Sequence, residues 1–283
     1  MCRGFDPLLR YQSLKHKLMT KIKDIFIFHQ KGMDPLVPYV KGAINDVMNC
    51  FAQYKQFFPI TNLGNWQSEN AYAYHNGGRV LKAYESIEWY LERAKQRAIQ
   101  EGRWQTTGQV NVEQMMFDLS NDPYFQQIPQ WGIYLTTYDL YGGAATNFCV
   151  GITHPNAFSV LSTRRFLDHN NHLNLNDFLT TVQHEFGHII RLTEGNHPNV
   201  EYALGPHCKN SECIMQQRMS GDFSDVTENR LKRKAAGLPP ICPDCMLQGR
   251  KALFRLYAAH ENGHHPNAPF GPHGPHNPNG GRS

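Results

Sequence analysis

The segment His184-Glu185-Phe186-Gly187-His188 restricts what this 283-residue chain can fold into more than any other. Two histidines four positions apart leave the same face of an α-helix about one turn apart, as two ligands of one tetrahedral zinc must. Glu185 lies beside the first histidine and can take a proton from a water that the metal activates. The segment therefore predicts a helix that carries a catalytic zinc.

The residues around this motif have the pattern of an amphipathic helix. From Asn174 to Leu192, apolar residues recur at helical spacing and form a stripe suited to burial. Asn176 or Asp177 can cap the helix at its start, and Gly195 is suited to end it. The motif therefore falls on the clearest helix that the sequence predicts.

A third zinc ligand must follow the two histidines, because a catalytic zinc keeps three protein ligands and one open position. Three downstream residues qualify by type: Glu194, His197 and His207. Residue type and spacing do not choose among these three candidates, so the identity of the third ligand stays undecided at this point.

The cysteines form a second metal-ligand pattern. Cys208 and Cys213 make one pair, and Cys242 and Cys245 make another within a short Cys-Pro-Asp-Cys loop. Two such pairs have the spacing of a four-cysteine structural zinc site. A redox role for the loop is disfavoured because no βαβ pattern precedes it. The remaining cysteines are expected to be ordinary thiols: Cys2, Cys50 and Cys149.

Segments typical of strands and of helices alternate along the rest of the chain. Short apolar runs bounded by turn residues predict strands at 24–28, 57–63, 132–138, 146–153 and 157–163. Helical spacing of apolar residues predicts helices at 35–54, 80–100, 113–119 and 246–260.

Composition excludes several classes of function. The formal net charge of +4 comes without a long cluster of Lys and Arg, which disfavours nucleic acid and anionic membranes as partners. No apolar run is long enough for a membrane-spanning helix, and the first twenty residues do not have the pattern of a signal peptide. Cysteines spaced as metal ligands fit a reducing compartment, so a cytoplasmic location is expected.

Taken in order, three motifs resemble the archaemetzincin family of zinc peptidases: His184-Glu185-x-x-His188, His207-Cys208-x4-Cys213-Ile214-Met215 and Cys242-x-x-Cys245. In that family the third zinc histidine directly precedes the first structural cysteine, and the methionine of a Met-turn follows the second. The resemblance implies that His207 is the third catalytic ligand and Met215 the Met-turn residue. It is specific over about residues 130–250 and includes the upstream segments Tyr138-Asp139-Leu140-Tyr141, Asn147-Phe148 and Gly151.

The chain departs from the family pattern after His188. The family places a glycine three residues later and the third histidine six residues later, where this chain has Arg191 and Glu194. His207 lies nineteen positions after His188, so an insertion of about thirteen residues is expected between the helix and the third ligand. The zinc helix could then run a turn longer before turning at Gly195, with the insertion at the rim of the cleft as a lid.

The resemblance implies an α/β fold of metzincin type. We expect a twisted mixed sheet over two long helices, with the zinc helix under the cleft and a small C-terminal lobe that carries the four-cysteine zinc. The expected organisation is a leader over 1–22, a single catalytic domain over 23–258, and a disordered tail rich in His, Pro and Gly over 261–283. Within the domain, the N-terminal lobe covers 23–192 and the zinc-binding lobe 207–258.

The expected activity is hydrolysis of peptide bonds with Glu185 as general base. One catalytic Zn²⁺ is expected on the histidines and one structural Zn²⁺ on the four cysteines. The expected partner is a peptide or protein substrate, and the resemblance implies short peptides cleaved from the amino end. The alternative is a zinc-binding or interaction protein on the same fold that has lost catalysis. The intact Glu185 argues against it, since a binding module needs no general base.

Overall fold

The computed structural model of this chain describes residues 22–65, 86–122, 130–142, 147–202, 205–217 and 224–262. The expected leader, apart from its last residue, and the expected tail from residue 263 onward lie outside the described residues. None of the described helices is long and apolar enough to cross a membrane.

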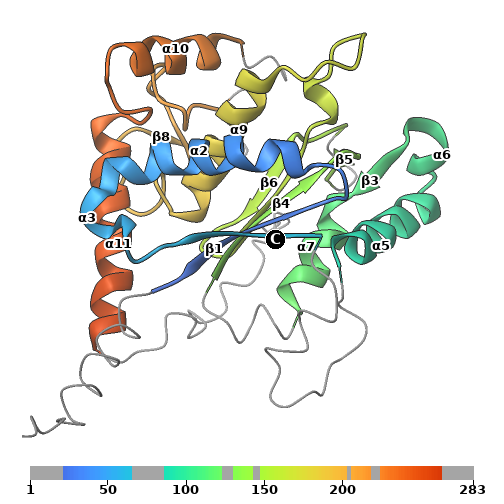
Figure 1. The fold of residues 1–283 in the computed structure, drawn as a ribbon, viewed down its shortest axis with the longest axis horizontal. Helices are drawn as coiled ribbons and strands as arrows, with labels where there is room; N and C mark the ends of the chain where they lie inside the picture. The colour runs from blue at the N-terminus through green and yellow to red at the C-terminus, as the bar shows by residue number, and fades with distance from the viewer. Residues whose placement is uncertain are drawn as a thin grey trace, which may run out of the picture.

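A five-stranded sheet forms the centre of the molecule, with strand order β2-β1-β4-β7-β6. Its strands are β1 (Asp24–His29), β2 (Ile60–Gly64), β4 (Gln130–Thr136), β6 (Gly151–His154) and β7 (Phe158–Ser162). Neighbouring strands pair in parallel except for β6, which is antiparallel to β7. The predicted mixed sheet is therefore confirmed, and its one antiparallel member lies at an edge (Figure 1).

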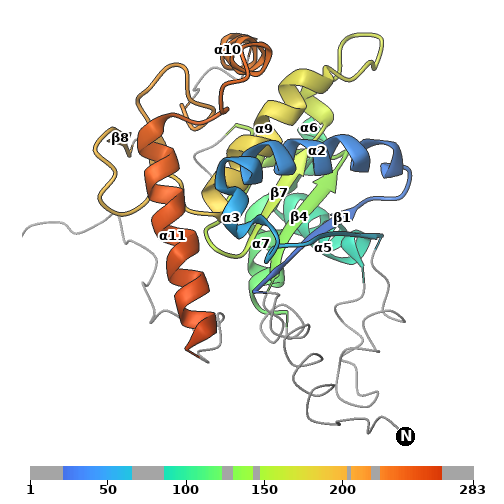
Figure 2. The ribbon, with the colours of Figure 1, turned by 60° about the vertical axis from the view of Figure 1, so that its left-hand side comes forward.

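Helices cover both faces of this sheet (Figures 1 and 2). On one face, α2 (Val37–Met48) packs beside α9 (Leu175–Ile189), and the opposite face carries α5 (Ile87–Gln100) and α7 (Val112–Ser120). Successive residues of a strand point to opposite faces, and both faces of a covered strand are apolar. In β1, Ile25 therefore joins the cluster under α2 and α9, whereas Phe26 joins the cluster under α5 and α7.

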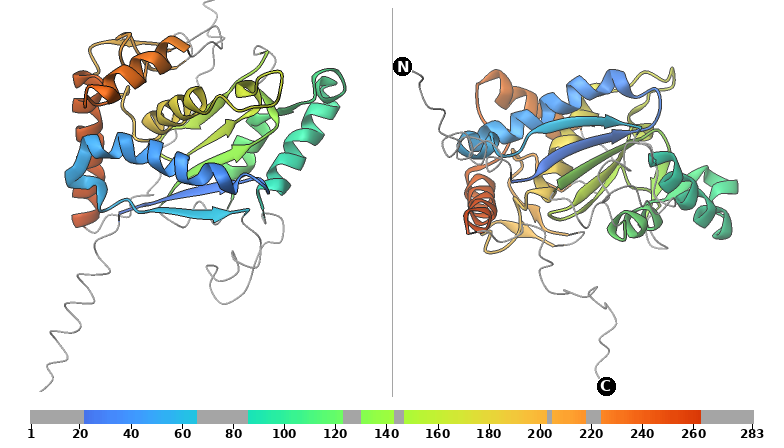
Figure 3. Two further views of the ribbon diagram at one scale, coloured as in Figure 1. Left: turned by 45° about the horizontal axis from the view of Figure 1, so that its top comes forward. Right: turned by 60° about the horizontal axis from the view of Figure 1, so that its bottom comes forward.

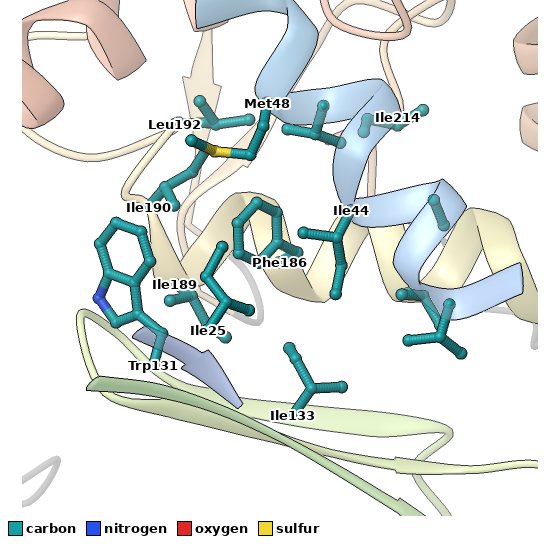
Figure 4. Packing of buried hydrophobic residues seen from close by; sticks show 14 of the residues in the cluster. Ile25, Ile44, Met48, Trp131, Ile133, Phe186, Ile189, Ile190, Leu192 and Ile214 are labelled. Carbon is teal, nitrogen blue, oxygen red and sulfur yellow. The ribbon is translucent and has the colours of Figure 1, made fainter. Parts of the chain in front are cut away.

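Phe186 illustrates how the zinc helix is held against the sheet. It lies between Ile44 of α2 and the strand residues Trp131 and Ile133, with no exposed surface (Figure 4). Its ring meets that of Trp131 edge-on at a centroid separation of 6.2 Å. Contact with both layers fixes the rotation of α9 about its axis, and hence the direction in which the histidines beside Phe186 point.

The C-terminal lobe is built from short strands and two helices, α10 (Ser224–Ala235) and α11 (Pro243–Glu261). Figure 3 shows α11 at the end of α2 and α3, and Gly249 allows this helix to approach closely, since a Cβ there would overlap Phe51 and Leu192. The remaining elements are η1 (Asp34–Leu36), η2 (Asn49–Phe51), α3 (Ala52–Lys55), α6 (Arg103–Thr107), β3 (Gln109–Asn111), β5 (Asp139–Tyr141), η3 (Arg164–Phe166), β8 (Val200–Glu201) and β9 (His207–Cys208).

Each predicted strand and helix has a counterpart, with the following corrections to where elements begin. The strand expected over 146–153 begins only at Gly151, because Cys149 pairs with Leu140 outside the main sheet. The helix expected from residue 80 begins at Ile87, where Ser86 caps it, and residues 80–85 lie outside the described part. The zinc helix is capped by the side chain of Asn174, not by Asn176 or Asp177.

Candidate metal centres

The C-terminal end of α9 is attached to the turn between β6 and β7. The Asn156 backbone N–H donates to the carbonyl of Ile189, the last residue of the helix, over 3.0 Å. The Asn156 side chain accepts from the Trp131 indole at 3.2 Å and from the Lys23 ammonium at 3.3 Å. The zinc helix is thus anchored to the sheet only one residue beyond His188.

Three histidine side chains converge beside this helix. His188 Nε2 lies 3.1 Å from His184 Nε2 and 3.2 Å from His207 Nε2. Zn–N bonds of about 2.0–2.1 Å in a tetrahedron place two nitrogens about 3.3 Å apart. The three nitrogens therefore fit one zinc ion, and the structure brings His207, not Glu194 or His197, to the two histidines of the helix.

Backbone carbonyls orient two of these imidazoles. His184 Nδ1 lies 2.6 Å from the Ile214 carbonyl oxygen, and His207 Nδ1 lies 3.1 Å from that of Gly205. A carbonyl can only accept, so each Nδ1 carries the proton and donates, which leaves the Nε2 lone pair at the point of convergence. Carbonyl acceptors of this kind are the usual outer partners of zinc-binding histidines.

The three imidazoles are in the neutral form that binds metal. Burial lowers the pKa of His184, and burial together with the two neighbouring imidazoles lowers the pKa of His188 well below its usual value. Burial and the neighbouring His184 lower the pKa of His207 to about 4. At neutral pH the cluster therefore offers three unprotonated nitrogens.

Glu185 lies between this cluster and the edge strand β6. Its side chain is 8% exposed, and burial raises its pKa, while a hydrogen bond from the Thr153 hydroxyl opposes that rise. A Cβ at Gly151 would lie 3.1 Å from Glu185 Oε1, so the backbone of β6 passes directly beside the carboxylate. Sequence analysis predicted Glu185 but not Thr153, whose role depends on a strand far from the motif.

The helix does not extend toward Gly195 as expected. It ends at Ile189, and Arg191 adopts a left-handed conformation with φ of 63°. The backbone N–H of Leu192 bonds back to Gly187, and the Arg191 side chain pairs with Glu194. Arg191 thus makes the left-handed turn at the position where the family pattern has glycine, and Glu194 is engaged in an ion pair.

Met215 lies against the zinc helix, as the resemblance implied. It has no exposed surface, and a Cβ at Gly187 would overlap its sulfur. Any larger residue at position 187 would force the buried Met215 side chain, which supports the helix between its two histidines, to move.

The four paired cysteines come together in a second cluster. Cys208 Sγ lies 3.7 Å from Cys242 Sγ, and Cys213 Sγ lies 3.6 Å from Cys245 Sγ. These distances are too long for disulfides and match the roughly 3.8 Å that Zn–S bonds of about 2.3 Å give in a tetrahedron. All four side chains are buried.

The four thiols lie close enough to affect one another's ionisation. Hydrogen bonds within the cluster lower the pKa values of Cys208 and Cys242 and raise those of Cys213 and Cys245. A divalent ion would favour the thiolate at every position, because metal ligation deprotonates cysteine.

His197 is brought to the cysteines and not to the histidines. Its Nε2 lies 3.2 Å from Cys245 Sγ, and it groups with Cys208, Cys242 and Cys245. The interpretation of His197 as a ligand of the catalytic zinc is therefore wrong. The pattern of ligand spacing gave no sign of this placement, because it depends on the path of a loop.

No family model and no curated protein matches this chain. Similar solved structures include an archaemetzincin from Methanopyrus kandleri at a TM-score of 0.48 and 18% identity, which covers 83% of this chain and 97% of that one. An archaemetzincin from Archaeoglobus fulgidus has a TM-score of 0.42 and 18% identity, and the match covers 80% of this chain and 99% of that one. A zinc-dependent peptidase from Methanocorpusculum labreanum has a TM-score of 0.39 and 15% identity, and the match again covers 80% of this chain and 99% of that one.

Proposed function

We propose that this protein is a zinc-dependent peptidase with a catalytic zinc on His184, His188 and His207. The observation that supports it most is the convergence of three neutral Nε2 atoms beside the buried Glu185 carboxylate of the same helix. A second, structural zinc on Cys208, Cys213, Cys242 and Cys245 would hold the C-terminal lobe together.

Glu185 acts as the general base. Zinc bound to the histidines would activate a water molecule and polarise the carbonyl of the scissile bond. The Glu185 carboxylate accepts the proton of the attacking water and then delivers it to the leaving amine. Burial, which raises the pKa of this carboxyl, makes it a better base, and the Thr153 hydroxyl holds it toward β6.

The edge strand β6 supplies a binding surface for the substrate. Among the described strands it has β7 on one side only, and it passes beside Glu185. An extended peptide can pair with such an edge through main-chain hydrogen bonds, which suits a peptide or protein substrate better than nucleic acid or membrane. Cleavage of short peptides from the amino end follows from the resemblance, and cysteines that are paired as metal ligands and not as disulfides suit a cytoplasmic location.

The test is a Glu185→Gln variant with Glu113→Gln as control, because Glu113 is exposed on α7. We expect Glu185→Gln to lower kcat/KM on a peptide library by about 10²–10⁴-fold with zinc content unchanged. Glu113→Gln should match the wild type. Full activity of Glu185→Gln would refute the assigned base.

Zinc per chain, measured by elemental analysis, tests the metal sites. Two zinc ions are expected in a chain whose tail histidines are changed to Ala: His264, His265, His273 and His276. A protein that holds both ions and cleaves no peptide in the library would instead be the non-catalytic zinc-binding protein.

A further inference from the structure

The loop between α9 and β9, residues 190–206, touches both metal clusters. It leaves the zinc helix beside His188, reaches the cysteines at His197, and returns to the histidines at Gly205. Residues 203 and 204 of this loop lie outside the described part. The expected insertion of about thirteen residues falls within this loop.

His197 offers a proton, not a lone pair, to the cysteine cluster. Its side chain is 7% exposed, and its Nδ1 accepts from the backbone N–H of Asn199 at 3.1 Å. A neutral imidazole with an accepting Nδ1 carries its proton on Nε2, which faces Cys245 Sγ. A protonated Nε2 cannot bind metal, so His197 is a hydrogen-bond donor to a cysteine ligand and not a ligand itself.

The stretch after His197 is fixed to the C-terminal lobe. Asn199 accepts from the backbone N–H of Lys209 at 2.9 Å, and its side chain donates to the Asp244 carboxylate at 2.6 Å. Strand β8 then pairs with β9 in antiparallel register, with Val200 opposite Cys208 and Glu201 opposite His207. Each of the two residues in β9 belongs to a different metal cluster.

The end of the loop orients the catalytic histidine. The Gly205 carbonyl accepts from His207 Nδ1, and the Thr193 hydroxyl at the loop's beginning donates to the Pro206 carbonyl at 2.6 Å. The loop is therefore closed on itself next to His207. A lid would need a segment free to open, whereas this one is bonded at both ends and in its middle.

We propose that residues 190–202 and 205–206 of this loop form a brace that couples the two zinc sites, with His197 as a positioning residue that donates to Cys245 and Gly205 as the acceptor that orients His207. This inference rests on the two zinc sites proposed above. It follows that loosening the loop at the cysteine cluster weakens metal binding at the histidine cluster.

The test uses the full chain loaded with zinc and the variants His197→Ala and His197→Gln. Glutamine can place an amide N–H near the position of Nε2, so it should rescue what alanine loses. His172→Ala is the control, because the His172 side chain is 80% exposed on another loop. Zinc release on treatment with excess N-ethylmaleimide is followed with a chromogenic chelator, and zinc affinity of the histidine site is measured by competition.

Loss of an outer hydrogen-bond partner typically lowers metal affinity by about 10–100-fold. We therefore expect His197→Ala to release the cysteine-bound zinc at least about tenfold faster and to weaken zinc binding at the histidine site about threefold or more. His197→Gln and His172→Ala should stay close to the wild type. Unchanged release in His197→Ala, or failure of His197→Gln to rescue, would overturn the role of the N–H donor.

Asn199→Ala provides a second route if His197→Ala does not fold. Asn199 is exposed, and the change removes only its side-chain bond to Asp244. The same two effects are expected with smaller size, and their absence would overturn the brace. A wild type without zinc at the cysteines would refute the proposed metal sites, whereas two zinc ions that the loop variants do not affect would refute the brace alone.

Discussion

The two metal clusters lie close together in the chain but are supported in different ways. The histidine cluster takes two of its members from one helix that packs on the central sheet, and His184 and His188 are partly exposed. The cysteine cluster takes its members from short segments of the C-terminal lobe, and all of them are buried. Catalytic zinc sites keep an open position and structural ones are closed. The difference indicates that the sheet can fold without metal, whereas the lobe needs it.

The largest expected effect sharpens that contrast. Cys242→Ser should remove the structural zinc and unfold the C-terminal lobe, because apparent zinc-binding energies of about 10 kcal/mol or more exceed what a small lobe gains by packing. We expect Tm in calorimetry to fall by more than about 10 °C. Cys149→Ser, at a half-buried thiol outside the cluster, is the control. A Tm within two or so degrees of the wild type would show that the lobe is stable without its metal.

The histidine cluster should respond in the opposite manner. His188→Ala should lower kcat/KM on peptides by about 10³-fold or more, because the variant loses the metal that activates water. It should retain one zinc per chain and show a smaller drop in Tm than Cys242→Ser. Zinc content, activity and calorimetry on the same sample decide this. Loss of both zinc ions would mean that zinc binding at the cysteines depends on zinc binding at the histidines, although different elements hold the two clusters.

Lys23 tests the sheet that supports the zinc helix. It is 1% exposed, and burial lowers its pKa to about 8 from 10.5. The folded state therefore releases this proton at a lower pH than the unfolded state, so the stability of the wild type should rise between pH 8 and 10.5 by about 3 kcal/mol. Below pH 8 the buried ammonium is a cost, and Lys23→Met should raise stability at pH 7 by about 2 kcal/mol.

Urea unfolding of wild type and Lys23→Met at several pH values measures this difference. The difference in the free energy of unfolding between the two proteins should become smaller above pH 8, with equal zinc content in both. A constant gap would mean that Lys23 does not titrate in this range.

The smallest effect concerns Arg191, where the chain passes from the helix into the loop. Its φ of 63° is unfavourable for every residue with a Cβ. Arg191→Gly and Arg191→Ala both lose the ion pair with Glu194, so their difference isolates the backbone term. We expect the glycine variant to be more stable than the alanine variant by about 1 kcal/mol in urea unfolding. Equal stabilities would show that the turn is not strained.

The sequence allowed much of the sheet and the ligand set to be predicted, for a local reason. Strands such as β1 and β4 are short apolar runs between turn residues, and the zinc helix carries a regular apolar stripe. Ligands on one helix face, such as His184 and His188, follow from helical spacing alone. Patterns among residues that are neighbours in the sequence can be interpreted without knowing how distant segments pack together.

What could not be predicted depends on tertiary contacts. The helix was expected to continue past Arg191 because nothing in its composition forbids that, yet bonds of Leu192 and Asn156 to α9 end it. His197 was weighed as a catalytic ligand because residue type cannot distinguish a ligand from a donor. Its position follows from the fold of the loop onto the lobe, and its role from the N–H of Asn199.

The two-residue strand β9 sets a limit on how this protein can change. Neighbouring residues of a strand point to opposite sides, and here His207 and Cys208 point to different clusters of metal-ligand side chains. A register slip of one position against β8 would turn the sulfur toward the histidine cluster and the imidazole toward the cysteines. A residue added between the two would turn both side chains to the same side. The order and the spacing of these two residues are therefore both fixed by the clusters to which they belong.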